Sequence, residues 1–355
     1  MTTHRRGPSL LASPIVLAVA AGLLSVPAHA APQPVSSPVP DPVAGPTLPP
    51  IASGVLVVSV DGLTPRSIRH LGREGTPTLH RLRRQGASTL DARTEREQTE
   101  TLPNHTGMVT GRRIDAARGG HGVTWNDDRR DPATVEEAAG HEVGSVFGEV
   151  HQAGRSTALF ASKTKLSLFE RSWPRAVHRS TILLDNGRLV RRARHDIARR
   201  TRAFRFVHLS EPDVVGHAHG FRSRAYHRAV GRADELVGSL LRSLRRHDLA
   251  GETVVVVTSD HGGIGDGHGD ASTPANYRIP FLVAGPGVAH GTDLYAINPA
   301  YADPGRHRTT YADDRQPVRN GAVGNLALDL LGLTGIPGSE HDVEQDLRVR
   351  PVGEG

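Results

Sequence analysis

Residues 55–62, with the sequence Val55-Leu56-Val57-Val58-Ser59-Val60-Asp61-Gly62, form a short apolar segment that ends in an acidic residue and a glycine. A continuous β-branched run of this length is typical of a strand that is buried on both faces of a parallel sheet. Four further runs have the same character, at residues 157–161, 204–209, 253–258 and 279–284. Helices are predicted between them, at 78–85, 104–110, 143–153, 189–202, 225–245 and 322–331. This alternation predicts an α/β fold, a three-layer αβα sandwich with a mostly parallel central sheet.

The amino-terminal residues have the composition of a targeting segment. Two arginines precede an apolar stretch from Leu10 to Val26, and Ala28-His29-Ala30 follows as a small-x-small cleavage site. This pattern predicts a signal peptide over residues 1–30, cleaved after Ala30, and therefore a secreted, extracellular protein.

The rest of the chain is expected to form a linker, one large domain and a short tail. Eight prolines in residues 31–50 predict an extended linker over 31–52. One domain is expected over 53–340 and a C-terminal tail over 341–355. No later apolar run is long enough to span a membrane, so we expect no membrane anchor after signal removal.

The composition excludes some classes of function. The formal net charge is +6, and the basic residues are almost all arginine, an excess that we interpret as general composition and not as a basic patch. Only 4% of the residues are aromatic and no reader motif occurs, so no nucleic-acid reader module is expected. Cysteine is absent, so an exported protein must be stabilised by a large core and bound metal without disulfides.

Three acidic residues follow predicted strands, namely Asp61, Asp213 and Asp260. Because ligands bind at the carboxyl ends of strands in an open parallel sheet, these carboxylates are expected to converge on one site. His217 and His261 accompany two of them, and carboxylate oxygen with imidazole nitrogen is a ligand mixture that zinc accepts. Taken singly, an aspartate after a strand is more often a turn residue or helix cap than a metal ligand.

The order of several short motifs resembles the alkaline phosphatase superfamily, and most closely its type I phosphodiesterase/nucleotide pyrophosphatase branch. The motifs are Asp61-Gly62, Thr101-Leu102-Pro103-Asn104-His105, His121-Gly122-Val123, Glu211-Pro212-Asp213-x-x-Gly-His217 and Ser259-Asp260-His261-Gly262. The resemblance implies a metallophosphohydrolase domain with two divalent metal ions, zinc being the expected metal, and a small phosphate ester as the substrate.

The resemblance also implies a role for each matching residue. One metal ion would be held by Asp61, Thr101, Asp260 and His261, and the other by Asp213, His217 and His268. His268 follows His261 by only seven residues, whereas many relatives place this ligand far downstream, so His290 is a rival for the position. Ligand types alone also allow manganese or iron.

Thr101 is the expected nucleophile, and the reaction would pass through a phosphothreonine intermediate. A metal-bound threonine hydroxyl loses its proton near neutral pH and can attack phosphorus in line. The alternative is an ordinary helix cap, and the two roles are compatible. Asn126 resembles the family asparagine that donates a hydrogen bond to a phosphate oxygen, with a turn residue as the alternative.

Lys163 and Lys165 are the only lysines in the chain. Two residues apart at a predicted strand end, they can present point charges to a substrate phosphate. A basic pair in a comparable region binds the terminal phosphate in some phosphomonoesterases of the superfamily, so this interpretation favours monoesters. Two solvated surface lysines are the alternative.

Other members of the superfamily, and a different class of protein, fit the sequence less well. A sulfatase-like enzyme would carry a modified Cys or Ser before x-Pro-x-Arg, and this chain has Thr101-Leu102-Pro103-Asn104 and no cysteine. A phosphomutase is disfavoured by export. A non-catalytic metal- or phosphate-binding protein would not require Thr101 or Asn126. The natural substrate, the choice between monoester and diester, the export route and the oligomeric state stay open.

Overall fold

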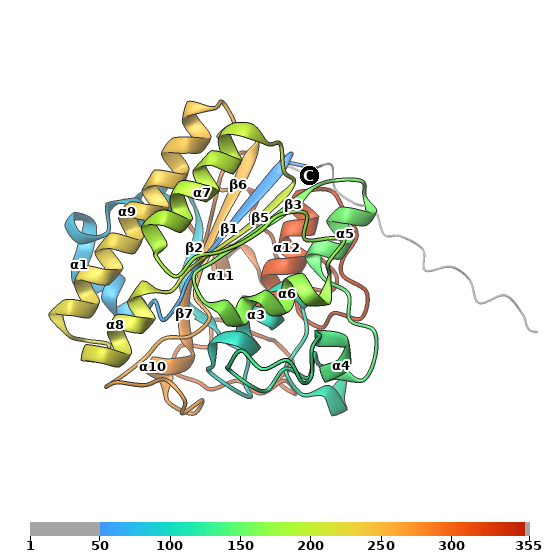
Figure 1. Ribbon diagram of the computed structural model, residues 1–355. Coiled ribbons are helices and arrows are strands. Elements are labelled where there is room, and N and C mark those ends of the chain that lie inside the picture. The colour runs from blue at the N-terminus through green and yellow to red at the C-terminus, as the bar shows by residue number, and fades with distance from the viewer. Residues whose placement is uncertain (1–49, 352–355) are drawn as a thin grey trace, which may run out of the picture. The chain divides into compact units, whose positions relative to one another are not determined.

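Residues 50–351 are described by the computed structural model, and they form the three-layer αβα sandwich that the sequence predicts (Figure 1). The expected signal peptide (1–30) and nearly all of the expected linker (31–52) lie outside the described residues. In residues 50–351, no helix combines the length and the hydrophobicity that a membrane crossing requires.

The central layer is an eight-stranded sheet with the order β4-β3-β5-β1-β6-β7-β2-β8. Strands β4, β3, β5, β1 and β6 are mutually parallel, whereas β7 runs antiparallel to both β6 and β2, and β8 pairs parallel with β2. The strands are β1 (Gly54–Val60), β2 (Gly86–Arg93), β3 (Thr157–Ala161), β4 (Ser180–Ile182), β5 (Phe204–Leu209), β6 (Thr253–Thr258), β7 (Arg278–Ala284) and β8 (Thr292–Asp293).

Helices cover both faces of this sheet. The first layer comprises α3 (Thr101–Thr110), α5 (Val146–Gln152), α6 (Ser167–Ser172) and α12 (Val323–Leu330). The second comprises α1 (Pro65–Gly75), α2 (Pro77–Gln85), α7 (Asn186–Arg199), α8 (Glu211–His219) and α9 (Arg224–Arg246). Shorter helices are α4 (Val135–Ala139), α10 (Pro274–Tyr277) and α11 (Leu294–Ile297), with 3-10 turns at Ala116–Arg118, Thr164–Leu166 and Asn320–Ala322.

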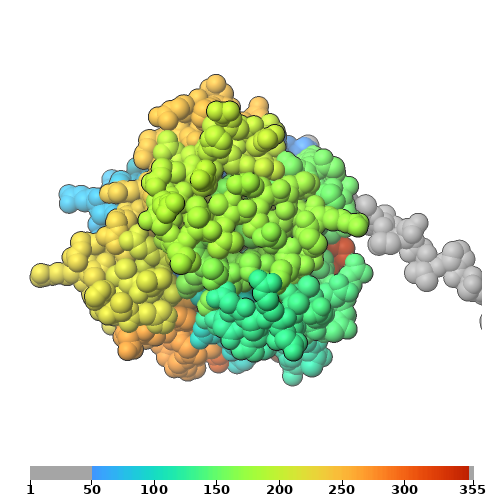
Figure 2. Space-filling view, in the orientation of Figure 1, coloured from blue at the N-terminus to red at the C-terminus, as the bar shows by residue number. Residues whose placement is uncertain are grey.

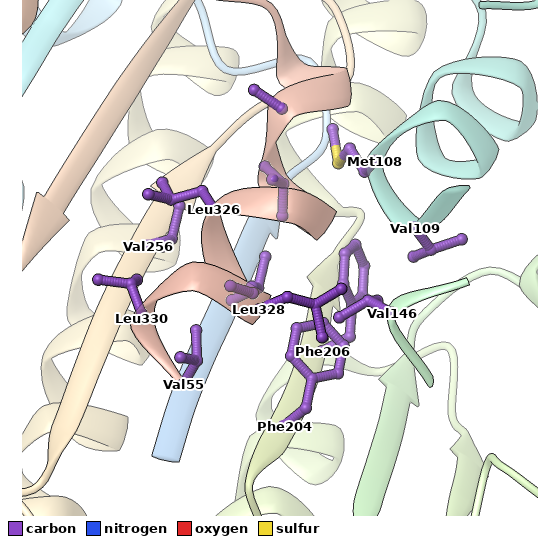
Figure 3. Close-up of a cluster of buried hydrophobic side chains, with 14 of the residues drawn as sticks. Val55, Met108, Val109, Val146, Phe204, Phe206, Val256, Leu326, Leu328 and Leu330 are labelled. Carbon is purple, nitrogen blue, oxygen red and sulfur yellow. The ribbon is translucent and has the colours of Figure 1, made fainter. Parts of the chain in front are cut away.

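The side chains of β1 explain why both faces are covered. Val55 and Val57 belong to the core under the first layer, whereas Leu56 and Val58 belong to the core under the second. Successive strand residues point to opposite faces, so an unbroken apolar run needs a partner on each side. Figure 3 shows the first core, in which side chains of α3, α5 and α12 meet those of β1, β5 and β6. Each large side chain buried there stabilises the fold by roughly 1.5–3 kcal/mol.

The elements that the sequence did not predict include the strand β2 and the helix α8, which carries Asp213 and His217. The strand β2 has the sequence Gly86-Ala87-Ser88-Thr89-Leu90-Asp91-Ala92-Arg93, whose polar residues hide its strand character. The helix α8 is short, begins with Glu211-Pro212 and contains Gly216, so its residues resemble a loop. A further difference is that α3 begins at Thr101, three residues before the expected start.

The residues expected to form a tail pack against the domain as far as they are described. Leu347 and Val349 are almost fully buried in the first core, and Ala289 N–H donates to Val349 O at 2.8 Å.

Candidate active site

The acidic residues that follow β1, β5 and β6 lie at one edge of the sheet. These strands are neighbours, with β1 in the middle and parallel to both others, so their carboxyl ends meet. Asp61 directly follows β1, Asp260 follows β6 by two residues, and Asp213 lies in the first turn of α8 after β5. All three are buried, at 0 to 2% relative exposure. The structure therefore brings together the three carboxylates singled out in the sequence.

Helix α8 explains the four-residue spacing between Asp213 and His217. Residues four apart on a helix share one face. Asp213 Oδ1 lies 3.4 Å from His217 Nε2 and 3.6 Å from His268 Nε2. The two histidine Nε2 atoms are 3.0 Å apart. Asp213, His217 and His268 thus form one group whose donor atoms could hold a metal ion.

A second group contains Asp61, Asp213 and His261. His261 Nε2 lies 3.4 Å from Asp61 Oδ1 and 3.9 Å from Asp213 Oδ1. Asp260 Oδ2 is 3.3 Å from the same nitrogen. Asp213 consequently belongs to both groups, whereas the resemblance implies it for only one of them.

Backbone carbonyl groups determine which ring nitrogen carries the proton in His217, His261 and His268. Nδ1 lies 2.7 Å from Asp266 O in His217, 2.8 Å from Gly262 O in His261 and 2.6 Å from Thr99 O in His268. A carbonyl oxygen can only accept, so each Nδ1 carries the proton. In the neutral ring, Nε2 then presents a lone pair toward the carboxylates, which is the form that binds a metal.

The buried oxygens support the same conclusion. Asp61 Oδ1, Asp213 Oδ1 and Asp260 Oδ2 have no hydrogen-bond partner among the described residues. Buried carboxylate oxygens are costly unless a cation or donor satisfies them. Oxygen and imidazole donors of this kind fit a divalent ion such as zinc.

Lys163 brings positive charge into this cluster. Its Nζ lies 2.7 Å from Asp61 Oδ2 and 2.6 Å from Asp213 Oδ2. Burial lowers the pKa of Lys163, but Asp61 and Asp213 outweigh it and raise the pKa above its usual value. The ammonium therefore remains charged.

Thr101 is buried at the first turn of α3 and faces both lysine and histidine. Its Oγ1 lies 3.4 Å from His261 Nε2 and accepts from Lys163 Nζ at 3.1 Å. The N-cap of α3 is Glu100, without a side-chain cap bond, so Thr101 is not the cap of this helix. Its hydroxyl is left to face the metal-ligand groups.

Asn126 is held beside Thr101 by three partners. Its Oδ1 accepts from Leu102 N–H at 3.0 Å and from Lys165 Nζ at 3.0 Å. Its Nδ2 donates to Glu100 Oε2 at 2.6 Å. With the oxygen bound to two donors, the amide orientation is fixed and one N–H of Nδ2 remains for a ligand.

His290 takes no part in this arrangement. It is exposed on the loop between β7 and β8, and the group that contains Asp213 and His217 is completed by His268 instead.

This chain is similar to known proteins in sequence and in fold. A family model described as type I phosphodiesterase / nucleotide pyrophosphatase matches residues 55–267. The chain belongs to this family. The matched range contains Asp61, Thr101, Asp213 and the Asp260-His261 pair. The predicted place of the chain in the alkaline phosphatase superfamily is thereby confirmed.

Individual relatives of this phosphodiesterase family are more distant. A 56-residue stretch is 38% identical to mouse ectonucleotide pyrophosphatase/phosphodiesterase family member 7, which is 16% of this chain and 13% of that protein's length. Murine ectonucleotide pyrophosphatase / phosphodiesterase 5 superimposes with a TM-score of 0.63 at 16% identity, covering 84% of this chain and 100% of the other. The human protein of the same name gives 0.58 at 14% identity, covering 80% and 96%. These structures establish the alkaline phosphatase-like fold.

Asp61 and Asp260, two neighbouring acids of the site, have pKa values that are shifted in opposite directions. Burial raises the pKa of Asp61, but Lys163 and then His208 reverse this effect and lower it well below its usual value. Burial, together with the charge of Asp61, raises the pKa of Asp260 well above its usual value. Lys163 and His208 thus shift the pKa of Asp61 in the direction opposite to the shift of Asp260.

Several residues that contact the candidate site residues were not predicted from the sequence. His208 on β5 lies 2.9 Å from Asp61 Oδ2, and the only signal for it is a polar residue inside the apolar run Phe204–Leu209. His105 Nδ1 donates to Thr101 O at 2.8 Å while its Nε2 accepts from Ser59 Oγ at 2.8 Å. His105 thereby connects α3 to β1, a role that its place in the Thr101–His105 motif did not reveal. Glu100, next to the candidate nucleophile Thr101, gave no signal at all.

Proposed function

We propose that this family member is a secreted hydrolase of phosphate esters that uses two divalent metal ions, zinc by ligand type, and a phosphothreonine intermediate on Thr101. The observation that carries the proposal is the position of Thr101 Oγ1, 3.4 Å from His261 Nε2 and 3.1 Å from Lys163 Nζ. It lies at the amino end of α3, where backbone N–H groups favour an anion. Family membership favours phosphodiesters and nucleotide pyrophosphates as substrates.

The donor sets divide between the two ions. Asp61, Thr101, Asp260 and His261 would hold one, and Asp213, His217 and His268 the other. When bound, such ions neutralise phosphate charge and activate a hydroxyl or water for attack.

The first chemical step is attack by Thr101. The hydroxyl loses its proton to solvent, its Oγ forms a bond to phosphorus as the P–O bond to the leaving group breaks, and the leaving oxygen departs with the electron pair and takes up a proton. The free N–H of Asn126 donates to a phosphate oxygen, and Lys165, which contacts Asn126, adds positive charge nearby. In the second step a water oxygen attacks the phosphothreonine, the P–Oγ bond breaks and Thr101 recovers its proton.

A solved relative supports the threonine role. One murine ectonucleotide pyrophosphatase / phosphodiesterase 5 structure is described as an inactive threonine-to-alanine variant in complex with AMP. For the present chain this favours a threonine nucleophile and a nucleotide-type ligand.

Phosphomonoesters are the second candidate substrates. Lys163 and Lys165 both reach the site, one beside Thr101 and the other on Asn126, so the alternative of two solvated surface lysines does not describe their environment. Two ammonium groups around one phosphate suit the extra negative charge of a monoester.

The test uses the purified protein with a nitrophenyl diester and a nitrophenyl monoester. We expect turnover to stop after chelation and to return with added zinc, and acid quenching to trap one phosphoryl group on Thr101. Absence of turnover on both esters with saturating zinc would contradict the proposal. Expression from residue 1 with sequencing of the exported amino terminus tests cleavage after Ala30.

A further inference from the structure

A groove of about 1070 Å³ lies between α7 and the edge of the sheet formed by β4. Five arginines contribute to its lining, Arg179, Arg192, Arg199, Arg200 and Arg202. Figure 2 looks onto the side of the molecule that carries α7. Arg179 meets four arginines from residues 192–202 here, so the expectation that the basic composition forms no basic patch is wrong.

The charges in the groove are largely uncompensated. In the described part of the chain, the guanidinium groups of Arg192, Arg199 and Arg200 have no hydrogen bond or ion pair. Asp196 is the one carboxylate among the described lining residues, and it is already bound by Arg202 at 2.8 Å and by Arg205 at 3.0 Å. Unpaired guanidinium groups gathered around a concave surface favour an anionic ligand.

The spacing of the arginines favours a chain of charges over a single ion. Arg192 and Arg199 are seven residues apart on α7, two helical turns, which separates them by about 10 Å along the axis. His195 lies between them on the same face, and Arg179 lines the groove from the β4 side. Arginines spread over this length of helix match a polymer with repeated phosphates better than they match a single phosphate.

The groove offers little to a nucleic-acid base. Its one aromatic carbon ring is that of Phe160, which is 1% exposed and so provides no stacking surface. Recognition of single-stranded nucleic acid normally combines positive charge with exposed aromatic platforms. A groove that has positive charge but no aromatic platform therefore favours a ligand that binds through its phosphate groups and not through bases.

The groove is also separate from the candidate active site. Ser156 and Arg202, which line it, precede β3 and β5. They lie at the amino ends of strands, whereas the candidate catalytic residues follow the carboxyl ends. We propose that this arginine groove binds a phosphate polyanion, a flexible chain of repeated phosphate groups, independently of the hydrolytic site.

The experiment measures binding of long-chain inorganic polyphosphate to the full chain, in a Thr101→Ala background that prevents turnover. The groove variant is Arg192→Ala/Arg199→Ala/Arg200→Ala. Its matched control is Arg242→Ala/Arg245→Ala/Arg246→Ala on α9, which removes the same charge from exposed positions outside the groove lining. With Thr101 intact, both triple variants should keep hydrolysis of a nitrophenyl ester within about twofold.

We expect the groove variant to raise the Kd for polyphosphate about tenfold or more and the α9 control to change it less than about threefold. The salt dependence of the Kd should also become shallower in the groove variant alone. Equal weakening in both variants, or no binding to the Thr101→Ala protein, would overturn the proposal. Tighter binding of a single-stranded DNA of equal charge would overturn it in favour of nucleic acid.

Discussion

His208 Nε2 donates a hydrogen bond to Asp61 Oδ2 at 2.9 Å. The proton is placed by the other side of the ring, because Ser162 N–H donates to His208 Nδ1 at 3.2 Å and that nitrogen must therefore accept. This bond occupies one oxygen of Asp61 and leaves Oδ1 facing His261. His208 is thus a positioning residue for a candidate metal ligand.

Replacement of His208 should weaken metal binding more than it disturbs the fold. Partners that orient metal ligands typically change metal affinity or activity about 10- to 100-fold. We expect His208→Phe to lower zinc affinity within this range in a competition titration with a chelating dye. His208→Gln, whose amide can still donate to Asp61, should recover part of the loss. Equal zinc affinity in wild type and His208→Phe would rule out the positioning role.

Thr101→Ala should abolish turnover while the protein continues to bind metal. Loss of a nucleophile lowers kcat by about three orders of magnitude or more, and the remaining donors of both groups stay in place. Zinc stoichiometry by mass spectrometry and kcat on a nitrophenyl diester are the measurements. Phosphoryl transfer to the Thr101→Ala protein after acid quench would contradict the assignment.

Lys165→Met should separate the two substrate classes. Because Lys165 contacts Asn126 and carries no ion pair with Asp61 or Asp213, its loss leaves the carboxylate cluster intact. We expect kcat/KM to fall about 10- to 100-fold for a monoester and less than about threefold for a diester. Adding Lys163→Met should deepen the monoester defect. Equal losses on both esters would reject a role in binding a terminal phosphate.

Asp342 should make the protein less stable as the pH rises from about 4 to about 8. Burial, followed by the charges of Asp346 and Asp329, raises the pKa of this carboxyl to about 8. Between the unfolded and folded pKa values the folded state holds one more proton, so stability falls with pH by about 1 kcal/mol per unit.

Asp342→Asn mimics the protonated acid and keeps the oxygen that accepts from Leu347 N–H at 2.9 Å. Its free energy of unfolding in urea, relative to wild type, should therefore increase between pH 5 and pH 8. The exposed Glu344→Gln, which removes a nearby carboxyl, is the control and should show less than half of this change. A difference that stays constant with pH would refute the buried-proton explanation.

Local sequence patterns predicted the sandwich because β1 and β6 are apolar enough to require cover on both faces. They predicted Asp61 and Asp260 because each follows such a strand closely. The same reasoning failed for β2, whose partners on either side are remote in sequence and whose polar residues carry no apolar pattern. His208 and Glu100 could not be predicted, since their importance lies in contacts across long sequence separations.

Gly122 illustrates the same limit of prediction from local sequence. Gly122 follows His121 in a motif that the resemblance singled out, but it has a φ of 71° and a Cβ there would collide with Ala138 O. Backbone packing against α4 is therefore sufficient to require this glycine.

The shared position of Asp213 has a consequence for how the site fills. Its Oδ1 lies 3.4 Å from His217 Nε2 and 3.9 Å from His261 Nε2, so one oxygen lies between the two groups of candidate ligands. An ion in one group would draw that oxygen away from the other group. The two ions would therefore enter with unequal affinities, and a titration with zinc would be biphasic, with the second ion exchanging faster than the first.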